Sequence, residues 1–217
     1  MDSEQHSRPI VAPQYCLARP TDLAFARKVD GVKHGKLSIT DVNGNILFWF
    51  DASAWRSKRK LVDAATGIPI LSITQKFWSA HDRWNVFMGD STNEKDLLFT
   101  VKRSSVFQLR TDLEVFLATN TNKNECDFKV KGEFHKRSSV IYKGNTSVVV
   151  AQMNKEHKVV KVPLGKHAFG VSIVENMDIA FIAGLVVVLN EFYEYEMAAV
   201  AGGASGAGTS AALAASC

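Results

Sequence analysis

The densest group of charged side chains in the sequence is RSKRK, at residues 56–60. Four cations in five residues can bind phosphate groups, and each adds about 1 kcal/mol of attraction near an anionic membrane. The same run could act as a nuclear-localisation patch, or it could be a solvated loop that leads into a strand. A second pair of cations ends the segment TVKR. The candidate residues for binding a lipid headgroup are therefore Arg56, Lys58, Arg59, Lys60, Lys102 and Arg103.

Enzymatic chemistry has no comparable support. The motifs GxSxG, HExxH and GxGxxG and the P-loop are missing, so no nucleophile, zinc or nucleotide site is indicated. His81 and Asp82 are adjacent, but neighbours on a strand point to opposite faces, and a turn is the better setting for them. The cysteines, Cys16, Cys126 and Cys217, have neither CxxC nor zinc-ligand spacing. We expect a protein that is not an enzyme and has no cofactor and no metal.

The composition of the chain limits the cellular compartments in which we expect the protein and the partners that we expect it to bind. The start of the chain is polar and lacks the apolar core of a secretory signal, and unpaired cysteines suit a reducing compartment. We therefore expect an intracellular protein, in the cytoplasm, at the cytoplasmic face of the plasma membrane or in the nucleus. The formal net charge of +4 permits contact with an anionic surface but is far from the basic extreme of dedicated nucleic-acid binders.

Short strands joined by glycine turns dominate the middle of the chain. Asn43-Gly44 favours a two-residue hairpin because a type I′ turn needs positive φ twice. Gly67 and Gly144 close two more hairpins, and the pattern predicts about ten to twelve strands. The strands follow one another too closely for crossover helices, so the sheet is antiparallel. In ILFWFD, at residues 46–51, apolar side chains fall on both faces, which indicates that part of the sheet is covered on both sides.

The stretch MDIAFIAGLVVVLNEF, at residues 177–192, is the strongest helix candidate, with Asn176 or Asp178 as its cap. Its length of about 24 Å falls short of a hydrocarbon core of about 30 Å, and its flanks are acidic at both ends. A helix that is apolar all round must be enclosed. The predicted fold is therefore mainly β, a closed antiparallel barrel of about twelve strands wrapped around a hydrophobic C-terminal helix. Gly184 predicts a close approach between barrel wall and helix.

These features resemble the plant LURP-one-related family, which is grouped with the tubby C-terminal domain and the phospholipid scramblases. The resemblance covers about residues 10 to 195, and its most specific parts are PQYC near the start and FGVSIVENMDIAFIAGLVVVLNE near the end. It implies a twelve-stranded barrel around a hydrophobic helix. It also implies a function, because tubby domains bind phosphoinositides and act as membrane-tethered transcription regulators, and the LURP-one branch is linked to plant defence.

The resulting expectation is a loosely ordered arm at 1–21, a single tubby-like barrel domain at 22–197 and a flexible low-complexity tail at 198–217. A frayed extension of the helix is the alternative for the tail. The expected function is a non-enzymatic binding and signalling module that binds phosphoinositides or other anionic lipids. The alternatives are a protein–protein scaffold without lipid specificity and, more weakly, calcium-regulated lipid scrambling. We expect a monomer with a protein partner of unknown identity and no direct binding of nucleic acid, since no helix suits a major groove.

Overall fold

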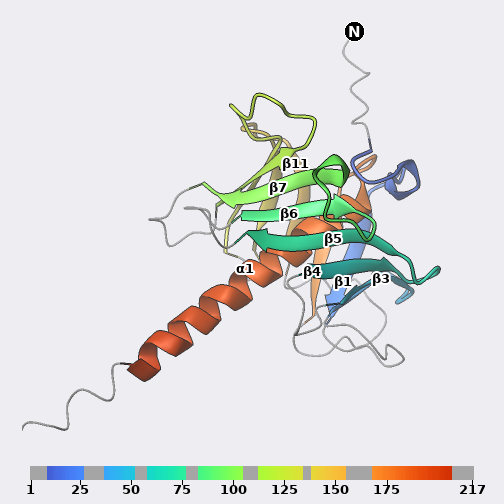
Figure 1. Ribbon diagram of the computed structural model, residues 1–217. Helices are drawn as coiled ribbons and strands as arrows, with labels where there is room; N and C mark the ends of the chain where they lie inside the picture. The colour runs from blue at the N-terminus through green and yellow to red at the C-terminus, as the bar shows by residue number, and fades with distance from the viewer. Residues whose placement is uncertain are drawn as a thin grey trace, which may run out of the picture.

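Twelve strands form a closed antiparallel barrel around the C-terminal helix (Figure 1). This computed structural model describes residues 9–26, 37–51, 58–76, 83–104, 112–133, 138–154 and 168–206, with side chains in α1 described to residue 194. The predicted fold class is confirmed. The strands are β1 (Thr21–Ala26), β2 (Leu37–Thr40), β3 (Ile46–Asp51), β4 (Lys58–Asp63), β5 (Pro69–Lys76), β6 (Arg83–Met88), β7 (Leu97–Arg103), β8 (Leu113–Leu117), β9 (Phe128–Lys131), β10 (Val140–Lys143), β11 (Val149–Asn154) and β12 (Phe169–Ile173).

Each strand pairs with its neighbours in sequence, and β1 pairs with β12 to close the barrel. The closing register places Leu23 opposite Val171, and both side chains are fully buried. Closure leaves the barrel without an edge strand that another chain could extend. β1 is not predicted from the sequence, because its six residues have neither a clear polar–apolar alternation nor a flanking glycine turn. The segment HKVVKV, at residues 157–162, is also predicted to be a strand from its apolar and basic residues, and it lies outside the described residues.

Hairpins are present at the three predicted glycines, but the two-residue type I′ turn predicted at Asn43-Gly44 is wrong, because Asn43 does not have positive φ. The Asp41 N–H instead donates to the Asn45 carbonyl at 3.0 Å, so the loop consists of Val42, Asn43 and Gly44. Gly44, Gly67 and Gly144 have φ values of +86°, +69° and +54°, which is the left-handed region that glycine enters without steric cost. They lie between β2 and β3, between β4 and β5, and between β10 and β11. The short 3-10 helices are η1 (Pro13–Tyr15) and η2 (Glu94–Asp96).

Helix α1 (Ile179–Gly206) fills the barrel with its first part and continues beyond the strands (Figure 1). Every residue from Ile179 to Phe192 is buried, so the apolar run predicted to need enclosure is enclosed. Gly184 lies against the wall as predicted: a Cβ there would stand 2.6 Å from Leu71 Cδ1 of β5. No helix among the described residues is long and apolar enough to cross a bilayer.

The start of α1 is fixed by Asp178, one of the two caps that the sequence predicts. Its Oδ1 accepts the backbone N–H groups of Ala180 and Phe181, each at 3.0 Å. Its Oδ2 accepts the N–H groups of Val11 at 2.7 Å and Ala12 at 3.2 Å. One buried carboxylate therefore caps the helix and also holds the N-terminal segment to it. At the other end the helical backbone continues through residues 198–206, while 207–217 lie outside the described residues.

Candidate functional site

The cation run of β4 is divided between the two faces of the barrel wall, because neighbouring residues on a strand point to opposite sides. Lys58 and Lys60 lie on the outer face, where their Nζ atoms contact Oδ1 and Oδ2 of Asp90 at 2.5 and 2.8 Å. These two hydrogen bonds lower the pKa of Asp90 to about 2. The Asp90 carboxylate, which lies in the β6–β7 loop, is therefore already paired with both lysines. Arg56 lies outside the described residues.

Arg59 points into the barrel, at the end where α1 leaves it. Its Nε contacts Glu191 Oε2 of α1 at 2.5 Å, and its Cζ lies 4.9 Å from the centroid of the Trp84 ring. The Glu191 side chain is only 4% exposed, and a buried carboxylate of this kind is strongly destabilising when its cation is removed. Arg59 therefore joins the wall to the helix.

The two candidate cations that end β7 also separate. Arg103 lies on the inner face, with its Cζ 5.8 Å from the centroid of Phe192 of α1. Lys102 lies on the outer face, with its Nζ 4.2 Å from the centroid of the Phe116 ring. Of the six lipid-binding candidates, the structure thus places Lys58, Lys60 and Lys102 on the outer wall and Arg59 and Arg103 inside, so adjacent candidates on one strand do not share a face.

The outer wall carries a different set of cations, brought together by strand register. Lys76 stands opposite Arg83, and Arg83 stands opposite Lys102. Lys102 faces Glu114, which in turn faces Lys129 on β9. We call Lys76, Arg83, Lys102 and Lys129 the basic row. With neighbouring strands about 4.8 Å apart, it spans roughly 19 Å of the wall.

Within the described residues the basic row is only partly neutralised. Glu94 Oε1 lies 3.5 Å from the Lys76 Nζ, and both side chains are more than half exposed. Arg83 is exposed. Like charges directly opposite one another on a sheet are destabilising, so the fold tolerates an unfavourable arrangement here. Sequence reasoning missed Lys76, Arg83 and Lys129 because they are far apart in the chain. The sequence signal that could have identified these three residues is the position of each one within its predicted strand.

Among the described residues, no group of His, Cys, Asp and Glu side chains could hold a metal ion. Burial raises the pKa of the Cys16 and Cys126 thiols, and Asp178 raises that of Cys16 further. The thiolate is the reactive form of cysteine, so both thiols are suppressed as nucleophiles. His81 and Asp82 lie outside the described residues, as do two weaker basic candidates of the sequence, HKR at residues 135–137 and KEHKVVK at residues 155–161.

The fold defines the class of this protein: a closed β-barrel whose centre is filled by the buried apolar part of a helix. The profile of the family described as LURP-one-related matches residues 21–190. The chain is 46% identical over 192 residues to Protein LURP-one-related 15 of Arabidopsis thaliana, covering 88% of each chain. It is 42% identical over 185 residues to Protein LURP-one-related 10 of the same plant, covering 84% of this chain and 95% of that protein.

A solved structure supports the same assignment. The X-ray structure of a protein from Arabidopsis thaliana superposes with a TM-score of 0.66 at 39% identity, covering 85% of this chain and 98% of that one. The chain belongs to the LURP-one-related family. The two relatives named here carry the name of that family and not the name of an enzyme.

Proposed function

We propose that this protein is a non-enzymatic binding and signalling module that docks on the cytoplasmic face of a membrane carrying phosphoinositides. The observation that carries the proposal is the basic row, where Lys76, Arg83 and Lys102 stand directly opposite one another on three adjacent strands. Because these like charges repel one another across the sheet, an anionic surface that neutralises them gains electrostatic energy. Clustered phosphates on a membrane are such a surface.

The filled lumen also favours recognition on the outside. The first part of α1 fills the centre of the barrel with buried apolar residues, so a substrate has no central cavity of the kind that open barrels provide. The resemblance to tubby domains supports the finer proposal of a membrane-tethered transcription regulator in plant defence, which moves between the plasma membrane and the nucleus. A protein partner would receive the signal.

The test is co-sedimentation with vesicles of neutral lipid, with and without a phosphoinositide. The double variant Arg83→Gln/Lys102→Gln removes two cations from the basic row. At about 1 kcal/mol for each cation near an anionic surface, the dissociation constant should rise roughly 30-fold. The matched control, Lys58→Gln/Lys60→Gln, removes the same charge from a strand where Asp90 already pairs with both lysines. It should bind nearly as the wild type does.

Equal losses in the two double variants would contradict a docking site at the basic row and leave only a general charge effect. Failure of the wild type to bind any anionic vesicle would contradict the membrane proposal as a whole. The alternative, a protein–protein scaffold without lipid specificity, would then account better for the exposed cations. Raising the salt concentration should weaken wild-type binding strongly, because interactions between exposed charges are screened over about 8 Å at physiological ionic strength.

A further inference from the structure

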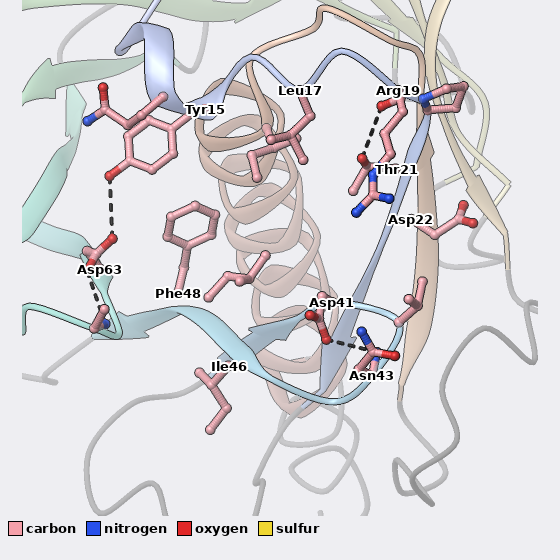
Figure 2. Close-up of a pocket in the computed structure, with 16 residues that line it drawn as sticks. Tyr15, Leu17, Arg19, Thr21, Asp22, Asp41, Asn43, Ile46, Phe48 and Asp63 are labelled. Atoms are coloured by element: carbon pink, nitrogen blue, oxygen red, sulfur yellow. Dashed lines mark hydrogen bonds between the residues drawn. The ribbon is translucent and has the colours of Figure 1, made fainter.

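A cavity of about 660 Å³ lies at the end of the barrel where α1 begins (Figure 2). Its lining comes from the N-terminal segment, the start of β1, β3, the β2–β3 and β4–β5 turns and Ile179, the first residue of α1. The volume falls within the range of about 300–1,000 Å³ that is typical of sites for small organic molecules. Because Ile179 begins α1 while Glu191 lies further along it, the cavity is at the opposite end of the barrel from the Arg59–Glu191 pair, and it shares no lining residue with the basic row.

The lining has two chemical parts. The apolar part includes Tyr15 and Phe48, whose rings meet edge to face with centroids 5.6 Å apart, together with Leu17, Ile46, Leu47 and Ile179. The charged lining residues are Asp22, Asp41, Asp63 and Arg19. With three carboxylates against one guanidinium, the electrostatic potential in the cavity favours a cation.

Asp63 and Tyr15 meet at one end of the cavity (Figure 2). Asp63 Oδ1 is used locally: it accepts the N–H groups of Ala65 and Thr66 at 3.0 and 2.8 Å and the Thr66 hydroxyl at 2.9 Å. Asp63 Oδ2 instead has the Tyr15 hydroxyl at 3.5 Å, which is longer than an ordinary O–H···O bond of about 2.7 Å. This oxygen therefore retains the capacity for a shorter, charge-assisted bond.

The state of Tyr15 suits the same role. Burial and the neighbouring Asp63 raise the pKa of the Tyr15 phenol above its ordinary value, so the hydroxyl stays protonated at neutral pH. Its ring is then a neutral aromatic face beside a carboxylate. Aromatic faces attract ammonium groups, and Tyr and Phe rings beside a carboxylate bind such groups by combining cation–π attraction with an ion pair.

We propose that this cavity binds a small organic ammonium compound, with its charged nitrogen between Asp63 Oδ2 and the Tyr15 ring and its apolar body against Phe48 and the aliphatic lining side chains. The excess of carboxylates in the lining favours a positively charged ligand. The Tyr15 and Phe48 rings favour a ligand with a flat or slender apolar body. This site is independent of lipid docking on the outer wall.

The experiment uses the full chain and three probes of similar shape: 2-phenylethylamine, its uncharged counterpart 2-phenylethanol and the anion 3-phenylpropanoate. Binding is followed by the amide chemical shifts in 1H–15N NMR spectra. The amine should bind saturably and shift amides around Tyr15, Leu17 and Phe48. Its dissociation constant should be at least tenfold lower than that of the alcohol, and the anion should not bind.

Asp63→Asn separates charge from shape, because the amide oxygen still accepts the turn N–H groups while the negative charge is gone. It should weaken amine binding at least tenfold and leave alcohol binding unchanged. The matched control, Asp90→Asn, makes the same change in an exposed loop carboxylate and should bind the amine as the wild type does. Val42→Lys, at the half-exposed rim, adds a competing cation and should also block the amine, which provides a second variant if Asp63→Asn does not fold.

The proposal is overturned if the wild type shows no saturable shift with the amine, or if the shifted amides lie away from the cavity. It is equally overturned if alcohol and amine bind alike, or if folded Asp63→Asn and Val42→Lys both retain wild-type affinity for the amine.

Discussion

The carboxylate of Asp178 is expected to hold the N-terminal segment and the central helix together, and removing it should be among the more damaging single changes. Asp178 is 2% exposed and accepts four backbone N–H groups, from Val11, Ala12, Ala180 and Phe181. Loss of a helix cap lowers stability by about 1 kcal/mol. Stranding the buried Val11 N–H adds about 2 kcal/mol. Asp178→Ala should therefore lower the free energy of unfolding by roughly 3 kcal/mol.

Asp178→Asn divides this total into its two parts. The amide retains one oxygen that can cap α1, but its Nδ2 group replaces the oxygen that accepts the N–H groups of Val11 and Ala12. The Nδ2 hydrogens and these two backbone N–H groups are all donors, so they cannot form hydrogen bonds with one another. The loss should be about 2 kcal/mol, because the cap remains and the link to the N-terminal segment does not. Since that segment carries Tyr15 and Leu17 of the cavity, Asp178→Asn should also weaken binding of an ammonium probe.

The assay is equilibrium unfolding in urea, with amide hydrogen exchange at Val11 and Ala12 as a local readout. For a chain of this size, 1 kcal/mol corresponds to about 2–4 °C in Tm, so Asp178→Ala should melt roughly 6–12 °C below the wild type. Glu125→Gln, at an exposed carboxylate, is the control and should change stability by less than about 0.5 kcal/mol. If both Asp178 variants lose less than about 1 kcal/mol and keep exchange protection at Val11, the Asp178 carboxylate does not hold the N-terminal segment to the helix.

Two further outcomes follow from packing and charge. Gly184→Val should lower stability by about 2 kcal/mol despite the better helix propensity of valine, because its Cβ would meet Leu71 Cδ1 at 2.6 Å in a closely packed core; unchanged urea unfolding would refute the close contact. The pKa of Asp90 is lowered to about 2 in the folded state, so the pairing stabilises the protein above the unfolded pKa of about 3.9 and is lost as pH falls toward 2. The stability difference between wild type and Asp90→Asn should therefore be below about 1 kcal/mol at neutral pH, disappear near pH 2 and shrink in high salt; a difference that persists near pH 2 would contradict this assignment.

The barrel and its central helix could be predicted because each depends on short stretches of sequence. Gly44, Gly67 and Gly144 mark turns through a local backbone requirement, and the apolar run from Ile179 to Leu189 cannot remain exposed in water. β1 escaped prediction because its residues carry no local signal of their own. It is held in place by pairing with β2 and β12. β12 is far from β1 in the sequence, and β2 is separated from it by a loop.

The candidate site was harder to predict for the same physical reason. A run such as RSKRK suggests a single basic surface, yet the alternation of a strand turns Arg59 inward to Glu191 and leaves Lys58 and Lys60 outside with Asp90. Whether a cation is available depends on the carboxylates that surround it in space, and those come from other strands, from loops and from the helix.

The amino-acid sequence by itself determined the fold class, the antiparallel hairpins, the central helix and its cap at Asp178, since each follows from local backbone preference or from the need to bury a continuous apolar segment. The tertiary structure alone decided which charges face outward together. Lys76, Arg83 and Lys102 form a row only through the register of three strands, and Tyr15 meets Asp63 only because the N-terminal segment folds across the end of the barrel. Register and closure arise from contacts between distant residues, which no local pattern encodes.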